Sequence, residues 1–276
     1  MKKNIVKIFV VPVLFIFSGA GTTTSENPFP DLERYKLKNG LEVIFADFGE
    51  LPVTAMTFYV NAGKKSETPG QQGLADLTAN SLELGNEKYS RTEQDRQLYR
   101  TGGSLNVSAN ENFTTMQIQF LNKDISEGMD LAANVLLKPL FPKDEIDQER
   151  GFELSQNKPD KMDIGVLADM YGNYFTYGIA HPLGRHYYEA QYSKITIDQI
   201  KQFYSFNYTP GNTKLVVTGK PDRDAVKKLI EQYFGSWTAA YGEVNGSSYD
   251  IPSIKAHEYA FVPKQGATQE IGRAHV

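Results

Sequence analysis

Alternation between apolar and polar positions predicts the β-strands of this chain. Asn39-Gly40 interrupts one alternating stretch, and this dipeptide favours the tight turn of a hairpin. Asn110-Glu111-Asn112 separates a second pair of alternating stretches in the same way. The predicted strands cover residues 34–48 (a hairpin), 53–62, 104–109, 113–121 and 214–218.

Apolar positions that recur every three or four residues predict helices between and after these strands. Thr92 is the expected N-cap of the second helix, and Gly102-Gly103 is its expected end. Hairpin strands followed by grouped helices indicate an α+β fold, with an antiparallel-rich sheet and helices packed on one face. The predicted helices cover residues 73–84, 92–100, 126–137, 143–156, 163–175, 197–206 and 223–233.

The two ends of the chain differ in character from its middle. Lys2 and Lys3 precede a short apolar run that ends in small residues, which predicts a secretory signal peptide over residues 1–20. A membrane anchor is the alternative, although the run is short for a bilayer span of about 20 residues. Residues 270–276 resemble the translation of a sequencing adapter and are predicted to be a non-native tail, in which case the natural protein continues.

Composition predicts the remaining boundaries. Residues 21–32 are predicted to be a linker and residues 33–240 one domain, while residues 241–269 form a second linker and the start of another domain. Loss of the signal peptide, which contains three lysines, changes the formal charge from −4 to −7. The mature protein is therefore expected to be acidic and exported, in the periplasm or outside the cell.

Composition also excludes several kinds of chemistry. With a net charge of −4 and no long basic run, binding to nucleic acid has little electrostatic support. The chain has no cysteine, which excludes disulfides, thiolate zinc sites, cysteine nucleophiles and a bacterial lipoprotein anchor. No G-x-S-x-G sequence is present to form a serine nucleophile elbow.

The segment Gly73–Asn80 carries the strongest functional signal. It is similar to the inverted zinc motif H-x-x-E-H, in which two histidines four residues apart hold the metal and the glutamate is the general base. Laid over this segment, the histidine positions fall on Asp76 and Asn80, and the glutamate position falls on Ala79. The alternative is an amphipathic helix without any such ancestry.

Flanking motifs extend this similarity over roughly residues 33–240. The motifs are Asn39-Gly40-Leu41, Gly85–Tyr89, Phe141-Pro142, Glu149-Arg150, Tyr208–Asn212, Leu215–Gly219 and Phe234–Trp237. Each is short, but they occur together in the order typical of one family, and on them the chain resembles the pitrilysin/insulinase (inverzincin) metallopeptidases. The resemblance implies an N-terminal peptidase half-domain, with a second, similar half to follow.

The resemblance also implies a third zinc ligand seven residues after Glu149, at Gln156. Zinc ligands are imidazole, carboxylate or thiolate groups, so only Asp76 of the three positions is a good ligand, and Ala79 offers no base. His181 and His186 flank a Pro- and Gly-containing loop and are not expected to bind metal. We therefore predict no catalytic residues, no metal and no cofactor here, whereas active relatives are expected to hold zinc.

Three functions remain open from the sequence. The first is a non-catalytic homologue that pairs with an active zinc peptidase as a heterodimer and encloses a peptide or unfolded polypeptide in a chamber. The second is an envelope binding or scaffold protein that reuses the fold. The third is an active zinc metalloendopeptidase whose ligands are misassigned. A dense aromatic cluster is expected to belong to the core, or else to a chamber wall or interface: Tyr171, Tyr174, Phe175, Tyr177, Tyr187, Tyr188 and Tyr192.

Overall fold

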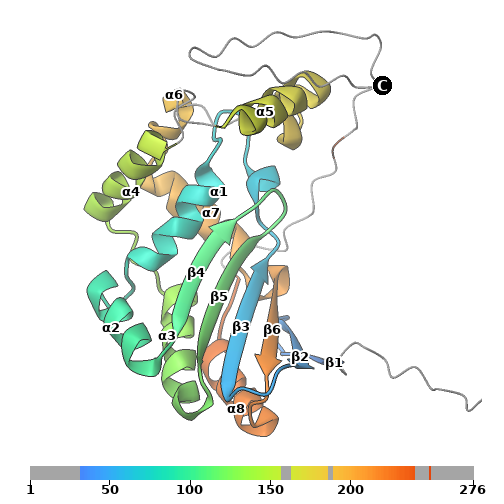
Figure 1. Cartoon of the computed structure of the whole chain (residues 1–276), viewed down its shortest axis with the longest axis vertical. Coiled ribbons are helices and arrows are strands. Elements are labelled where there is room, and N and C mark those ends of the chain that lie inside the picture. Colours follow the sequence, from blue (N-terminus) through green and yellow to red (C-terminus); the bar gives the residue numbers. More distant parts are fainter. Residues whose placement is uncertain (1–31, 157–162, 186–188, 240–248, 250–276) are drawn as a thin grey trace, which may run out of the picture. The chain divides into compact units, whose positions relative to one another are not determined.

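The computed structural model describes residues 32–156, 163–185, 189–239 and 249. The elements form a six-stranded sheet with helices beside and behind it (Figure 1). The predicted signal peptide and the predicted non-native tail lie outside the described residues. Among the helices that are described, none has the length and apolar character needed to cross a membrane.

The sheet is mixed but mostly antiparallel, as the sequence predicts. Its spatial order is β1-β2-β6-β3-β5-β4, and among these neighbours only β2 and β6 run parallel. The last strand therefore inserts between two early ones, and β4 is left at an edge. The strands are β1 Leu32–Lys36, β2 Glu42–Asp47, β3 Val53–Val60, β4 Ser104–Ala109, β5 Thr114–Leu121 and β6 Thr213–Gly219.

The predicted hairpin turn joins β1 to β2 and also has a tertiary role. The Leu37 amide donates to the Leu41 carbonyl at 2.9 Å, and Gly40 supplies the positive φ of +100° that the turn requires. The Asn39 side-chain amide donates to the carbonyls of Phe234 and Trp237 at 2.7 and 2.9 Å. The turn thus ties the start of the domain to its last helix.

The seven predicted helices are present, with two local corrections, and the short helix Glu189–Tyr192 was not predicted. The predicted helix 73–84 is α-helical only as far as Ser81 and ends in the 3₁₀ turn η2 (Leu82–Leu84). Ser90, not Thr92, is the N-cap of the second helix, because Ser90 and Glu93 form a capping box. The helices are α1 Leu74–Ser81, α2 Arg91–Thr101, α3 Ile125–Leu137, α4 Lys143–Gln156, α5 Ile164–Tyr177, α6 Glu189–Tyr192, α7 Ile197–Asn207 and α8 Arg223–Phe234.

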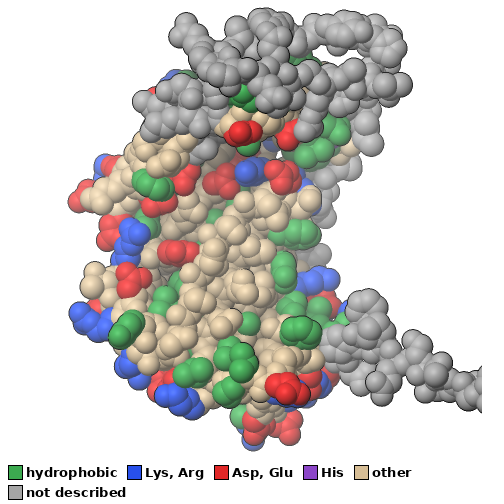
Figure 2. All heavy atoms as spheres, viewed as in Figure 1, with side chains coloured by type: hydrophobic (Ala, Val, Ile, Leu, Met, Phe, Trp, Pro, Cys, Tyr) green, Lys and Arg blue, Asp and Glu red, His purple; other side chains and the backbone are tan. Residues whose placement is uncertain are grey.

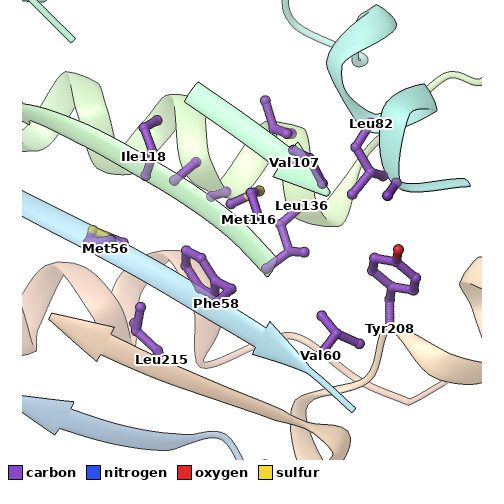
Figure 3. Packing of buried hydrophobic residues seen from close by; sticks show 14 of the residues in the cluster. Met56, Phe58, Val60, Leu82, Val107, Met116, Ile118, Leu136, Tyr208 and Leu215 are labelled. Carbon is purple, nitrogen blue, oxygen red and sulfur yellow. The ribbon is translucent and has the colours of Figure 1, made fainter. Parts of the chain in front are cut away.

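The hydrophobic core lies on one face of the sheet. Met56 and Phe58 of β3 point to the same side as Met116 and Ile118 of β5, towards Leu136 of α3 (Figure 3), and all five are at most 1% exposed. Burying one such side chain stabilises a fold by about 1.5–3 kcal/mol. Figure 1 shows α3 and α8 behind the strands. The prediction of helices packed on one face is confirmed.

Over β4 and β5 the opposite face of the sheet is polar and uncharged. Strand register places Ser108 beside Thr115, and Asn106 beside Gln117, and the hydroxyls of Ser108 and Thr115 lie 3.2 Å apart. Figure 2 shows this face over β4 and β5 as mostly neither charged nor hydrophobic, with charged side chains gathered along the helical margin. This part of the face offers hydrogen-bonding groups to a ligand and does not favour ligands of either charge.

The aromatic cluster does not form part of one core, which corrects the leading sequence interpretation. Tyr192 is buried, at 1% exposed, but Phe175 on α5 is 55% exposed. Tyr187 and Tyr188 lie outside the described residues. The α5 aromatics therefore belong to a partly exposed surface.

Candidate functional site

A carboxylate from the preceding loop holds the start of α1. Gly73 adopts φ +91° at the N-cap, and the Glu67 Oε1 atom accepts hydrogen bonds from the amides of Gly73 and Ala75 at 3.1 and 2.9 Å. Glu67 is only 4% exposed, and this burial raises its pKa to about 8. The helix that carries the motif positions is thus fixed by a buried acid outside the motif.

Asp76, at the first motif position, is engaged in an ion pair. Its Oδ2 atom lies 3.4 Å from the Nζ atom of Lys64 in η1 (Lys64–Ser66). Burial raises the pKa of the Asp76 carboxyl, and the positive charge of Lys64 opposes that rise. The single ionisable group that the motif retains therefore already has a cationic partner.

The other two motif positions on α1 serve packing and helix contact. Ala79 is fully buried, and its methyl group can neither accept nor deliver a proton. The Asn80 side-chain amide donates to Glu149 Oε1 of α4 at 3.3 Å. Where the resemblance implies a base and an imidazole, this chain has a core methyl and a link between two helices.

Gln156, at the implied third ligand position, is the last residue of α4 and is exposed. It lies two helical turns, about 10 Å, along α4 from Glu149, which is the residue of α4 that reaches Asn80. The structure therefore brings α4 to α1 as the resemblance implies, but the groups that meet are an amide and a carboxylate.

These residues do not fit a zinc ion. A catalytic zinc site needs three protein ligands from imidazole, carboxylate or thiolate groups, and the motif positions provide one carboxylate that is paired with Lys64. Across the described part of the chain, no group of three or more His, Cys, Asp or Glu side chains is placed to hold a metal. No reaction step can be assigned to zinc at these positions.

A cleft of about 240 Å³ opens beside α1 at the motif position Asn80. It is polar, because carboxylates, amides and a guanidinium face it from η2, α2, β4 and α4. Sequence reasoning did not find it, since the pairing that brings β4 to α1 cannot be read from local patterns. Its lining residues are Asn80, Glu83, Leu84, Arg91, Asn106, Val107 and Glu149.

His181 has a structural part in its loop. Its Nδ1 atom accepts a hydrogen bond from the Leu183 amide at 3.2 Å, and its ring stacks on Tyr177 with centroids 4.8 Å apart. His186, the other histidine considered from the sequence, lies outside the described residues.

Two family models match the chain. "Insulinase (Peptidase family M16)" matches residues 50–164, which include α1 and the whole of α4. "Peptidase M16 inactive domain" matches residues 194–272, which include β6 and α8.

Curated relatives and solved structures point to the same family. The chain is 25% identical over 230 residues to "Zinc protease PqqE" of Helicobacter pylori, covering 81% of this chain and 51% of the relative. It is 23% identical over 237 residues to "Mitochondrial-processing peptidase subunit beta" of Caenorhabditis elegans, covering 79% and 50%. The chain thus spans about half the length of the curated relatives it matches.

Two crystal structures share the fold. A protease from Helicobacter pylori matches with a TM-score of 0.69 and 23% identity, over 82% of this chain and 53% of that one. A peptidase M16 inactive domain from Pseudomonas fluorescens matches with a TM-score of 0.71 and 21% identity, over 79% and 54%. By its motif order, its mixed sheet and both family models, this chain belongs to the pitrilysin/insulinase family of metallopeptidases, peptidase family M16.

Proposed function

We propose that this chain is a non-catalytic M16 homologue that pairs with an active zinc peptidase and forms one wall of a peptide-binding chamber. The observation that carries the proposal is Ala79, fully buried where the motif requires a general base. Peptide hydrolysis at a zinc site needs both the metal and a group that takes a proton from the attacking water. A chain that lacks the base and two ligands would contribute a peptide-binding surface to the complex and would not catalyse hydrolysis itself.

Two surfaces support peptide contact. Within the described part of the chain, the edge strand β4 has one side without a strand neighbour, and extended peptides bind such edges through main-chain hydrogen bonds. The uncharged polar face over β4 and β5 adds hydroxyl and amide groups, among them Asn106, Thr115 and Gln117. Contacts of this kind suit polypeptides of varied sequence, because they engage the backbone.

An exposed apolar surface supports pairing. Five apolar side chains of α4, α5 and the turn after α5 are between 40% and 58% exposed, and exposed apolar surface is a feature of protein–protein interfaces. A stable heterodimer needs about 1,200–2,000 Å² of buried surface in total, and one relative is itself named as a subunit. The residues are Phe152, Val166, Phe175, Ile179 and Leu183.

Co-expression tests the pairing. The full-length gene is expressed with a neighbouring homologue that has an intact H-x-x-E-H motif, and the complex is purified through a tag on one partner. We expect co-purification, with cleavage of an unstructured peptide faster than for the active partner alone. A full-length protein that stays monomeric and leaves its neighbour's activity unchanged would favour a solitary binding protein.

We further propose export, with cleavage near Ala20. The charged start and the short apolar core of residues 1–20 support it. Mass spectrometry of the native protein is expected to show a new N-terminus after Ala20 in the periplasmic or extracellular fraction. An intact Met1 in the cytosolic fraction would refute export.

A further inference from the structure

The edge strand β4 is not fully open, because a side chain from outside the sheet holds one of its amides. The Val107 amide donates to Glu83 Oε1. Val107 pairs in register with Met116 of β5, and the backbone groups of successive residues in a strand alternate between its two sides. Since the Val107 amide meets Glu83, it points away from β5, as do the backbone groups of Leu105 and Ala109.

Glu83 is fixed in this position by its surroundings. It belongs to η2, directly after α1, and its backbone carbonyl accepts a hydrogen bond from Gln94 Nε2 of α2 at 2.8 Å. Its carboxylate faces the cleft together with Glu149 of α4 and Arg91 of α2. Burial raises the pKa of Glu83, while its bond to Val107 and the charge of Arg91 oppose the rise, and Glu149 and Asp95 add to it.

An extended peptide that adds to β4 needs the backbone groups on its free side. Strand addition pairs every second residue of the edge with the incoming chain, so Val107 is the central contact between Leu105 and Ala109. A carboxylate that accepts from a backbone amide makes a stronger bond than a neutral carbonyl does. An incoming peptide must therefore replace a charged acceptor by a neutral one.

We propose that Glu83 is a displaceable cap on β4 that competes with extended polypeptide for the Val107 amide. The inference rests on the proposed function, since it concerns the same peptide-binding edge. The cap blocks unselective addition of strands, which unprotected sheet edges invite. It leaves β4 available to a peptide that makes further contacts along the polar face of the sheet.

The test compares the chain with its Glu83→Ala variant in two measurements. The first is hydrogen exchange of the Val107 amide in the absence of peptide. The second is fluorescence anisotropy with a labelled, unstructured peptide of uncharged residues, long enough to pair with the six residues of β4. Glu87→Ala is the matched control, because Glu87 is exposed in the next turn, pairs with Lys138 and does not line the cleft.

We expect the Val107 amide to exchange at least about tenfold faster in Glu83→Ala, because a hydrogen bond to a charged group is lost. We expect the peptide to bind about tenfold tighter to this variant for the same reason. Glu83→Gln keeps an acceptor oxygen without the charge, so its Val107 exchange rate and its peptide affinity are expected to lie between those of the unaltered chain and Glu83→Ala. Glu87→Ala is expected to match the unaltered chain in both measurements.

The possible failures are distinct. Unchanged Val107 exchange in Glu83→Ala would overturn the cap itself, whatever the peptide does. Faster exchange with equal peptide affinity in both proteins would show that Glu83 does not compete with the peptide, and would also overturn the proposal. Faster exchange with no detectable peptide binding to either protein would refute the peptide-binding function. It would then also refute the competition of the Glu83 cap with peptide.

Discussion

The two sides of α1 differ in what their side chains contact. The core side still meets the demands of the fold, with Leu74 and Leu77 at most 2% exposed. On the site side the motif positions make structural contacts, because Asp76 pairs with Lys64 and Asn80 donates a hydrogen bond to Glu149. Core packing of α1 is therefore kept, with Ala79 as part of the core, although the motif positions offer no base and only one good zinc ligand.

The largest expected effect comes from breaking the core side. Leu77→Ala removes a fully buried side chain from α1, and such substitutions lower the free energy of unfolding by about 2–5 kcal/mol. Urea denaturation monitored by circular dichroism measures the change. A loss below about 1 kcal/mol would mean that α1 is not packed as described.

A smaller effect is expected at the start of α1, where it depends on pH. The pKa of Glu67 is about 8 in the fold against an ordinary value of 4.5, so the folded state binds the proton more tightly than the unfolded state. Its contribution to stability is therefore complete below about pH 4.5 and is lost as the pH rises towards about 8. The loss is a few kcal/mol at most, since one pKa unit corresponds to about 1.4 kcal/mol.

The comparison protein is Glu67→Gln, which keeps an acceptor for the Gly73 and Ala75 amides but does not ionise. Urea unfolding at about pH 5 and about pH 8 is expected to show a steeper fall in stability for the unaltered chain than for the variant. If stability fell equally with pH in the two proteins, the raised pKa of the buried Glu67 carboxyl would be contradicted.

The smallest effect is expected on the site side. Asn80 and Glu149 interact at 3.3 Å, and a double-mutant cycle of Asn80→Ala and Glu149→Ala is expected to give a coupling of about 0.5–1 kcal/mol in unfolding free energy. A coupling near zero would mean that Asn80 no longer links the helices, and the site side of α1 would then have no structural role.

The sequence predicted the positions of the helices and strands better than it predicted which elements lie side by side in the fold. Periodicity located the helices and strands, and motif order identified the family. It could not place β6 between β2 and β3, because that pairing joins residues about 170 positions apart. For the same reason it missed the contact of Glu83 with Val107, and it assigned the α5 aromatics to the core because periodicity does not report what a helix packs against.

The motif positions were predictable as residue types but not as contacts. Asp76, Ala79, Asn80 and Gln156 follow from aligning a short pattern. The partners Lys64 and Glu149 come from other segments and are known only from the fold. The absence of bound metal and of catalytic activity remain predictions.

Zinc content of the purified chain tests the central claim most directly. The chain is equilibrated with excess zinc, dialysed and analysed for metal, beside an Asp76→Ala variant. We predict no stoichiometric zinc in either protein, because the motif positions offer one carboxylate that Lys64 already neutralises. One tightly held zinc per chain that is lost in Asp76→Ala would contradict the account and show that Asp76 belongs to a metal site.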